Sequence, residues 1–340
     1  MSDAHVHTVS WHHGQRGHVA YQGYLANGSP LTLHCGVDGW RHPVRDIPMD
    51  YVVKGVAVAQ VPDIGNHLAL DCAVTDGDSW DNNYEANYRL WVGDPPIDAH
   101  VHAANDGYGR LGFGSLRAAM RSAGIDTAVV STMDNCMDDR MVVSVPRLYR
   151  LVWVRPGRPS LDDVRARLRH GYVGIKLHPS YDHYPADDPR LDGYIQAVQD
   201  VGGVVTVHSG PAESEPDLIR RLAERFPAVP FVLYHTYLGP GDGRRRAVNH
   251  AHALPNLYLE TSWCGFDDVR WLVDEVGPER VVFGSDAAVD GPVHYVQSPA
   301  SLAGNHNYNE YLILLAGNLD EHAARRVLRD NAMHLFRIHA

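Results

Sequence analysis

The chain is poor in cysteine and contains no long apolar run. Its four cysteines, at positions 35, 72, 136 and 264, show no Cys-x-x-Cys spacing. That distribution excludes a structural zinc ribbon and a small disulfide framework, and it suits a reducing compartment. No stretch approaches about 18 uninterrupted apolar residues, and no apolar leader segment stands at the N-terminus. The sequence therefore predicts no membrane partner and, by default, a cytoplasmic location.

Positive charge is also scarce. Lys and Arg number 30 against 41 Asp and Glu, which gives a formal net charge of −11. A phosphate-binding surface needs clustered cations, and the one dense basic run, at 244–246, opens a predicted helix, where arginines are typical of a solvated face. We expect no nucleic-acid partner and a small-molecule substrate instead.

From Ile97 onward, the sequence repeats a short apolar strand, a loop and an amphipathic helix. Strands that alternate with helices form parallel sheets, and eight such units in about 245 residues fit a closed (β/α)₈ TIM barrel better than an open doubly wound sheet. The predicted strands are Ile97–His102, Asp126–Thr132, Arg150–Arg155, Val173–His178, Gly203–His208, Pro230–His235, Asn256–Ser262 and Arg280–Asp286. The predicted helices include Leu116–Ala123, Asp162–Arg169, Leu191–Val201, Asp217–Arg225 and Phe266–Val276.

The first 94 residues follow a different pattern. Short strand-like runs alternate there with clusters of Gly, Pro, Asn and Asp, which is typical of a small all-β, sandwich-like domain. These runs are Leu31–His34, Tyr51–Val58, His67–Cys72 and Tyr88–Val92. The Gly93-Asp94-Pro95-Pro96 segment provides a stiff hinge. We therefore predict an α/β protein with an all-β domain at 1–94 and a barrel at 95–340.

Histidine is abundant, with 22 residues, and matters chemically where its spacing supports a site. In a parallel barrel, alternate side chains point inward, and those at the carboxyl ends of the strands open onto the mouth. In the first barrel strand we expect the apolar residues 97, 99 and 101 to face the helices. The residues between them then point inward, namely Asp98, His100 and His102.

The same alternation selects His208, His235 and Asp286 at the ends of three later strands. A single histidine at a strand end is more often structural. Several ionisable groups buried together at one end of a barrel are costly unless they share a partner, and a bound cation is the best candidate for that partner. Imidazoles with a carboxylate suit zinc with an open position for water. We expect one divalent metal, Zn²⁺ first, with Mn²⁺ or Fe²⁺ as alternatives.

These strand ends carry a family resemblance. The segments Ile97–His102, Gly174–Pro179, Val207–His208, Tyr234–His235 and Phe283–Asp286, together with the closing stretch 327–336, resemble the amidohydrolase superfamily over residues 97–338. The resemblance implies a metal-dependent enzyme. It implies that His100, His102 and His208 are metal ligands and that Asp286 is both a ligand and the proton carrier. It implies that His235 either contacts the ligands from behind or stabilises the transition state.

Other residues at the predicted mouth are candidates for substrate binding. Lys176 and His178 face inward on the fourth strand, where a lysine must have a partner. Some superfamily members carry a carboxylated lysine that bridges two metals here, but we favour a contact between Lys176 and a substrate carboxylate. Glu260 ends the seventh strand and either contacts substrate or braces the barrel.

Two loops and one repeated motif complete the predicted site. The long segment 287–307, which contains Tyr295 as a substrate-binding candidate, is expected to be a lid, and residues 182–184 a second wall. Asp-Ala-His-Val-His occurs at 98–102 and also at 3–7. The first copy follows no apolar strand and precedes no βα repeat, so we interpret His5 and His7 as part of a flexible start without metal.

The N-terminal region carries a second resemblance. Segments 33–40, 47–49 and 75–88 resemble a starch-binding carbohydrate-binding module, which folds as a β-sandwich, over residues 28–93. This implies a glucan or sugar partner, with dimerisation into a homodimer or cover for the active site as alternative roles. Trp40 and Trp80 are either a stacking platform for sugar rings or core residues, and we favour the core.

Three functions remain open from the sequence. The leading hypothesis is hydrolysis of an amide, lactone or ester of a small molecule by metal-activated water, with Asp286 taking the proton and His235 stabilising the oxyanion. A non-oxidative decarboxylase on the same scaffold is the alternative, since similar family members use the metal to hold a carboxylate. A non-catalytic binding protein is the third, which the intact set of metal-type residues disfavours.

Overall fold

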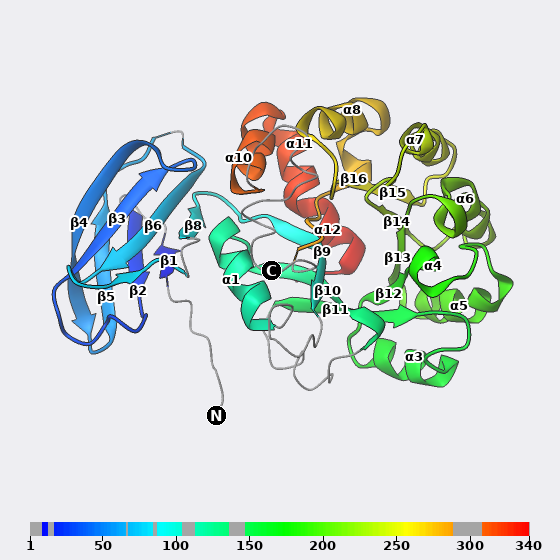
Figure 1. Cartoon of the computed structure of the whole chain (residues 1–340), viewed down its shortest axis with the longest axis horizontal. Coiled ribbons are helices and arrows are strands. Elements are labelled where there is room, and N and C mark those ends of the chain that lie inside the picture. Colours follow the sequence, from blue (N-terminus) through cyan, green and yellow to red (C-terminus); the bar gives the residue numbers. More distant parts are fainter. Residues whose placement is uncertain are drawn as a thin grey trace.

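The computed structural model describes residues 9–12, 17–65, 67–83, 87–103, 113–135, 147–287 and 308–339. Within these ranges the chain forms an antiparallel sheet and a parallel sheet ringed by helices (Figure 1). Each helix of this part is too short or too polar to cross a bilayer.

The eight parallel strands occur where the sequence predicts them, with boundaries that shift by a few residues. They are β9 (Ile97–Ala103), β10 (Thr127–Thr132), β11 (Leu148–Val154), β12 (Gly174–Leu177), β13 (Val204–His208), β14 (Phe231–Tyr234), β15 (Leu257–Glu260) and β16 (Val281–Val282). Each pairs with the next in parallel register, in the order β9 to β16.

The two edge strands of this sheet approach each other across a seam. The Asp286 amide donates to the His100 carbonyl at 2.8 Å, and the Ala99 amide donates to the Phe283 carbonyl at 3.0 Å. A parallel bridge joins Val101 to Ala287. The sheet is therefore a nearly closed eight-stranded barrel, which brings the carboxyl ends of all its strands to one rim.

Amphipathic helices cover the outside of the barrel, as Figure 1 shows. The five helices that the sequence predicts are present as α1 (Phe113–Ala123), α3 (Leu161–Arg169), α5 (Asp192–Val201), α6 (Pro216–Arg225) and α8 (Phe266–Val276). The others are α4 (Pro179–Asp182), α7 (Gly243–Ala253), α10 (Tyr308–Asn318), α11 (Glu321–Arg325) and α12 (Asn331–Phe336). Short 3₁₀ turns lie at Met133–Asn135, Pro189–Leu191, Ala212–Ser214 and Pro278–Arg280, and a π turn lies at Arg326–Asp330.

The prediction for the first barrel strand was wrong in one respect. Ile97 and Ala99 pack in the barrel interior, with Val232 and with Phe336 of α12, rather than against the surrounding helices. The pairing of β9 with β10 changes register between Ala128 and Val130, and such a bulge reverses the alternation of side chains. Beyond it, His100 and His102 point inward while Val101 and Ala103 join the outer core.

The antiparallel sheet precedes the barrel in sequence. Its strands are β1 (Val9–His12), β2 (Gly17–Tyr21), β3 (Leu31–Val37), β4 (Arg41–Val53), β5 (Val56–Val61), β6 (Ala69–Thr75), β7 (Trp80–Asp81) and β8 (Tyr88–Trp91). Their order is β1-β2-β5-β4-β3-β6-β7, with β8 paired to β6. The sheet curls around a core of its own, which includes Tyr21, Leu33, Leu70 and Val74. The predicted division near residue 95 stays a prediction.

The predicted strand Tyr51–Val58 was wrong, because this stretch turns back on itself. β4 ends at Val53, a turn follows at Lys54–Gly55 with Gly55 at φ +80°, and β5 begins at Val56. Apolar residues on both sides of the turn hide it from a reading of hydrophobicity alone, and the positive φ marks Gly55 as the turn residue.

The two sheets meet where β8 contacts α1. The Trp91 indole donates to the carbonyl of Ala123, the last residue of α1, at 2.9 Å. Gly124 follows at φ +68°, and a Cβ there would lie 2.6 Å from Trp91 and 2.7 Å from the Arg89 carbonyl. Trp91 belongs to the same apolar cluster as the outer core of the barrel.

Candidate active site

Histidine and carboxylate side chains converge at the carboxyl-end rim of the barrel. His100 Nε2 lies 3.0 Å from His102 Nε2, and both nitrogens lie 3.2 Å from Asp286 Oδ1. All three residues are buried, His100 to 1% exposure. The structure thus brings together residues 186 positions apart in sequence, as the pattern of strand ends predicts.

The remaining ring nitrogens of these histidines face acceptors behind the site. His102 Nδ1 lies 3.2 Å from the Ser131 carbonyl, and His100 Nδ1 lies 3.3 Å from Glu260 Oε2. In the tautomer that these acceptors favour, each Nδ1 carries the ring proton and each Nε2 keeps a lone pair. Two lone pairs that face each other across 3.0 Å, beside a carboxylate, repel unless a cation lies between them.

His235 reaches the same centre, although not by the alternation that selected it. Phe231 and Leu233 pack in the outer core, so regular alternation would send His235 outward as well. Its backbone has φ +69°, and this left-handed turn after β14 redirects the ring inward. His100, His235 and Asp286 each offer a ligand atom within 4.8 Å of the other two.

Hydrogen bonds fix the tautomer of His235. The Ser262 hydroxyl donates to Glu260 Oε2 at 2.7 Å, so its oxygen accepts from His235 Nδ1 at 2.8 Å. His235 Nε2 is then a lone-pair donor. Burial, with the charges of His208 and Lys176, holds the pKa of His235 well below its usual value. A neutral ring of this tautomer suits a metal ligand, whereas the predicted oxyanion role requires a proton on Nε2.

His208, predicted as a ligand, lies next to this group but outside it. Its ring stacks on His178 at 4.0 Å and contacts His235 edge to face at 4.8 Å. His208 Nδ1 is buried without a hydrogen-bond partner among the described residues. Burial lowers the pKa of His208 to about 3 and that of His178 to about 2. Its role as a ligand remains a prediction.

Lys176 is one of only two lysines in the chain and is completely buried. Its Nζ lies 3.4 Å from His100 Nε2 and 3.9 Å from the centre of the Tyr234 ring. Burial lowers the pKa of Lys176 to about 7, against the opposing charges of Asp286 and Glu260. Lys176 therefore lies beside the predicted metal position, where it could hold an anionic group of a substrate.

Glu260 is braced by the protein rather than free to face a substrate. One oxygen accepts from the His235 amide at 2.8 Å and from the Ser262 hydroxyl at 2.7 Å. The Ser262 amide donates to the other oxygen at 2.5 Å. Burial outweighs these bonds and raises the pKa of Glu260 to about 8. Of the two alternatives left open by the sequence, the contacts favour bracing.

Two tryptophans at the rim were missed by sequence analysis. The Trp263 indole donates to Asp286 Oδ2 at 2.8 Å, and the Trp153 indole donates to Asp182 Oδ2 at 2.8 Å. Trp153 also stacks on His178 at 5.6 Å and meets Tyr181 edge to face at 6.0 Å. Their places, at or just beyond predicted strand ends, are the signal that could have found them.

Asp286 is held as an anion. Burial raises the pKa of Asp286, but the close approach of His100, His102 and Lys176 lowers it well below its usual value. Of the predicted second wall at 182–184, Asp182 contacts Trp153 and Arg155, whereas Tyr184 packs in the outer core; its role as a wall stays a prediction. Tyr295 and the rest of the predicted lid at 288–307, and His5 and His7, lie outside the described residues.

Trp80 of the antiparallel sheet is not a core residue, contrary to our preference, whereas Trp40 is partly buried. Trp80 is 49% exposed. His34 stacks on Trp40 with 5.4 Å between ring centres and meets Trp80 edge to face at 5.5 Å. These three rings form an aromatic cluster of which Trp80 is the exposed member.

The donor set at the rim fits a divalent cation. His100, His102 and His235 each turn an unprotonated Nε2 towards the centre, and Asp286 adds an anionic oxygen. Imidazole nitrogens with one carboxylate are preferred by zinc and by other first-row transition metals.

Comparison with known proteins agrees with this architecture. Residues 3–338 match a protein-family model whose description is Amidohydrolase. Among solved structures, the chain resembles 5-carboxyvanillate decarboxylase from Sphingomonas paucimobilis, at 15% identity over 72% of this chain and 99% of that one, with a TM-score of 0.53. A protein described as a 2-pyrone-4,6-dicarboxylic acid hydrolase from Pseudomonas putida gives 17% identity over 72% and 98% of the two chains, with a TM-score of 0.54.

A third similar structure contains a metal. It is 5-carboxyvanillate decarboxylase from Novosphingobium aromaticivorans with bound manganese, at 13% identity over 72% of this chain and 98% of that one, with a TM-score of 0.54. At such identities these likenesses concern the fold alone.

One curated relative matches a shorter stretch of the chain. Over 81 residues, or 23% of this chain, the sequence is 33% identical to an alpha-amylase from Clostridium acetobutylicum. The chain spans only 10% of the length of that amylase.

Proposed function

The chain belongs to the amidohydrolase family, and from this premise we propose that it is a metal-dependent hydrolase that cleaves an amide, lactone or ester bond of a small molecule. The convergence of His100, His102 and Asp286 within 3.2 Å carries the proposal. His235 joins them as a nitrogen ligand rather than as an oxyanion donor, because its Nδ1 is engaged by Ser262. A divalent cation, when bound there, supplies a Lewis acid that polarises a carbonyl and acidifies a water.

The residues around this centre have separate roles in proton transfer, in the orientation of the ligands and in substrate binding. Asp286 is anionic, so it accepts the proton of the attacking water and returns it to the leaving group. The Trp263 indole holds one oxygen of Asp286 and leaves the other directed at the histidines. Glu260, through Ser262 and directly, orients the rings of His235 and His100. Lys176 provides the positive charge for a substrate oxyanion or carboxylate.

The wall beside the centre favours a flat substrate. Trp153, His178 and Tyr181 pack in stacked and edge-on contacts, and the ring of Tyr181, which is 54% exposed, can accept a planar ring. Two similar structures are named for cyclic carboxylates, a vanillate derivative and a pyrone dicarboxylic acid. We propose a cyclic lactone, amide or ester that carries a carboxylate, held between Lys176 and this wall.

Non-oxidative decarboxylation is the second candidate. It is favoured by Lys176, a buried cation placed where a carboxylate could be held next to the metal position. In that reaction Asp286 would have to take up a proton first and then donate it to ring carbon, which its lowered pKa disfavours. The aromatic wall serves either reaction.

Isotopic labelling separates the two. With a panel of carboxylated lactones, amides and aromatic acids in H₂¹⁸O, hydrolysis places ¹⁸O in one product carboxyl group and releases no CO₂. Decarboxylation releases CO₂, and in D₂O it leaves deuterium on the ring carbon. Decarboxylation without hydrolysis of any panel member would replace the first proposal by the second.

Substitution of the proton carrier tests the site itself. Asp286→Asn keeps the size of the side chain but removes its charge, so turnover should fall to below a few per cent of wild type while the thermal melting curve stays close to it. Retention of more than a few per cent of the activity in a folded variant would contradict the assigned role.

The aromatic cluster of the antiparallel sheet supports a separate binding function. We propose that His34, Trp40 and Trp80 bind a glucan, because sugar rings stack on exposed aromatic faces and Trp80 is 49% exposed. Affinity electrophoresis in soluble starch should retard the wild type but not Trp80→Ala. Trp271→Ala, on a barrel helix, is the matched control. No retardation of the wild type would leave the cluster with a structural role.

A further inference from the structure

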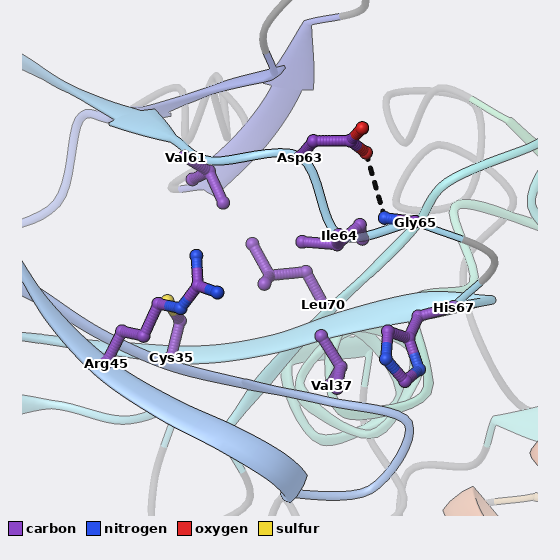
Figure 2. A pocket seen from close by; sticks show the side chains of 9 residues that line it. All are labelled: Cys35, Val37, Arg45, Val61, Asp63, Ile64, Gly65, His67 and Leu70. Atoms are coloured by element: carbon purple, nitrogen blue, oxygen red, sulfur yellow. Dashed lines mark hydrogen bonds between the residues drawn. The ribbon is translucent and has the colours of Figure 1, made fainter.

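A cavity of about 310 Å³ opens at one end of the core of the antiparallel sheet (Figure 2). It lies between strands β3, β4 and β6 on one side and the segment that follows β5 on the other. Its lining residues are Cys35, Val37, Arg45, Val61, Asp63, Ile64, Gly65, His67 and Leu70. None of them belongs to the barrel site.

The strand register explains why the cavity has an apolar floor. Cys35 pairs directly with Cys72 of β6, and Val37 pairs with Leu70. Residues two apart on a strand share a face, so Cys35, Val37 and Leu70 line the same side of the sheet. All three are at most 2% exposed. With Val61 and Ile64 opposite, this floor can hold an aliphatic or aromatic body away from water.

Arg45 places a positive charge over this floor. It is the direct partner of Cys35 on β4, and Figure 2 shows its guanidinium directed into the space between Val61 and Leu70. Arg45 lies close enough for its charge to lower the pKa of the Cys35 thiol, although burial, the larger effect, raises that pKa to about 11.

The neighbouring charged groups are engaged elsewhere. The Asp63 carboxylate accepts from the Gly65 amide at 2.8 Å, as the dashed line in Figure 2 marks. His67 Nδ1 lies 2.9 Å from Asp38. Asp46, next to Arg45 in sequence, points to the other face and pairs with His34 at 2.6 Å. Among the described residues, no carboxylate forms an ion pair with Arg45.

An apolar floor beneath an uncompensated guanidinium is complementary to one class of ligand. We propose that this cavity binds a small organic acid, with its carboxylate on Arg45 and its apolar body between Val61 and Leu70. Arginine pairs with carboxylates through two parallel hydrogen bonds. A volume near 310 Å³ is at the lower end for ligand sites, which fits a compact monocarboxylate.

Isothermal titration of the full-length chain with hexanoate tests the proposal. Binding should weaken by roughly fourfold for each methylene removed, through pentanoate to butanoate. Hexanamide, which has the same shape without the charge, should bind at least about tenfold more weakly. Acetate should not bind measurably. Equal affinity for hexanoate and hexanamide, or no binding of hexanoate at all, would overturn the proposal.

Two variants locate the bound acid. Arg45→Gln should raise the Kd for hexanoate by roughly tenfold or more, and Arg45→Lys, which keeps the charge but loses the paired geometry, by less. Lys176→Met removes the cation of the barrel mouth and should leave this binding intact. If hexanoate binding were lost in Lys176→Met and kept in Arg45→Gln, the acid would bind in the barrel and the cavity assignment would be wrong. Thermal melting of each variant confirms that it is folded.

Discussion

At the scale of single residues, the site depends on groups that orient others. Asp286 is held by an indole and two imidazoles, and His235 by a hydroxyl that Glu260 fixes in turn. Such partners limit the number of orientations available to a metal ligand. They also explain why so many ionisable side chains can be buried together: most of their polar atoms have a partner, and the Nε2 lone pairs face one common point.

Trp263→Phe tests this orientation. The substitution removes the indole N–H that binds Asp286 Oδ2 and keeps an aromatic ring. A hydrogen bond to a charged acceptor is worth about 1.5–3 kcal/mol, so kcat/KM should fall roughly 10- to 100-fold with little change in melting temperature. Trp271→Phe, which removes an indole bond to Glu275 on the helix surface, is the control. Wild-type kinetics in Trp263→Phe would show that the indole does not position Asp286.

Some predicted site residues reach the rim through regular alternation, and others reach it only because the backbone departs from that alternation. His208 lies on the inward face of β13, as expected, whereas Asp286 lies beyond the end of β16 and has a left-handed backbone at φ +60°. His235 reaches the centre through a left-handed backbone at φ +69°, and His100 through a bulge in β9. Both were selected on alternation that does not hold locally. Hydrophobic periodicity carries no information about such irregularities, because they arise from tertiary packing.

At the scale of elements, the eight barrel strands could be predicted because each is a short apolar run bounded by turn residues. Some elements of the antiparallel sheet were missed because they lack that pattern. The hairpin at Lys54–Gly55 has apolar residues on both sides, and β7 contains only Trp80 and Asp81. Trp153 lies near the end of β11, and Trp263 lies in the loop after β15. The positions of both residues at the rim depend on how the whole barrel folds. Contacts between side chains of separate strands are not encoded in local pattern.

An ion-pair network ties α6 to α7 and gives a pH-dependent prediction. Arg246 pairs with Glu215 at 2.6 Å and also with Asp217, and His250 Nε2 lies 2.8 Å from Asp217. Burial raises the pKa of Asp217, but the hydrogen bonds from His250 and Arg246 outweigh it and lower the pKa below its usual value. A lowered carboxyl pKa stabilises the folded state above the unfolded pKa, and this stability is lost as the pH falls through the folded value.

Asp217→Asn should therefore destabilise the chain by about 1 kcal/mol or less at pH ~6, since the network is partly exposed. The difference from wild type should shrink as the pH falls well below ~4. Urea unfolding at the two pH values measures it. Asp274→Asn, at an exposed position on α8, should show no such trend. A difference that grows towards acid pH would contradict the assignment.

At the scale of the whole molecule, the antiparallel sheet is joined to the barrel through a tight contact. Gly124 ends α1 directly against Trp91 and the Arg89 carbonyl, and the Trp91 indole binds the last residue of that helix. Adding a methyl group there requires strand β8 and the helix to separate. The packing of β8 against α1 is therefore sensitive to the addition of a single Cβ atom at Gly124.

Gly124→Ala should lower the free energy of unfolding by about 1–3 kcal/mol more than Gly65→Ala. The two glycines are matched in backbone, with φ +68° and +64°, but a Cβ at Gly65 meets nothing within 4 Å. The difference between them therefore reports the contact rather than the left-handed strain, which costs each variant roughly 1–2 kcal/mol. Equal destabilisation in chemical unfolding would mean that β8 and α1 do not pack as described.

We propose that the barrel rim is a metal site held by side chains from distant strands. Elemental analysis of the full-length protein, purified without chelators from metal-replete cells, tests it most directly. We expect about one equivalent of a divalent transition metal per chain, and a small fraction of that in His100→Ala despite an unchanged fold. A wild type with far less than one equivalent, or a His100→Ala variant that retains the metal, would contradict the account.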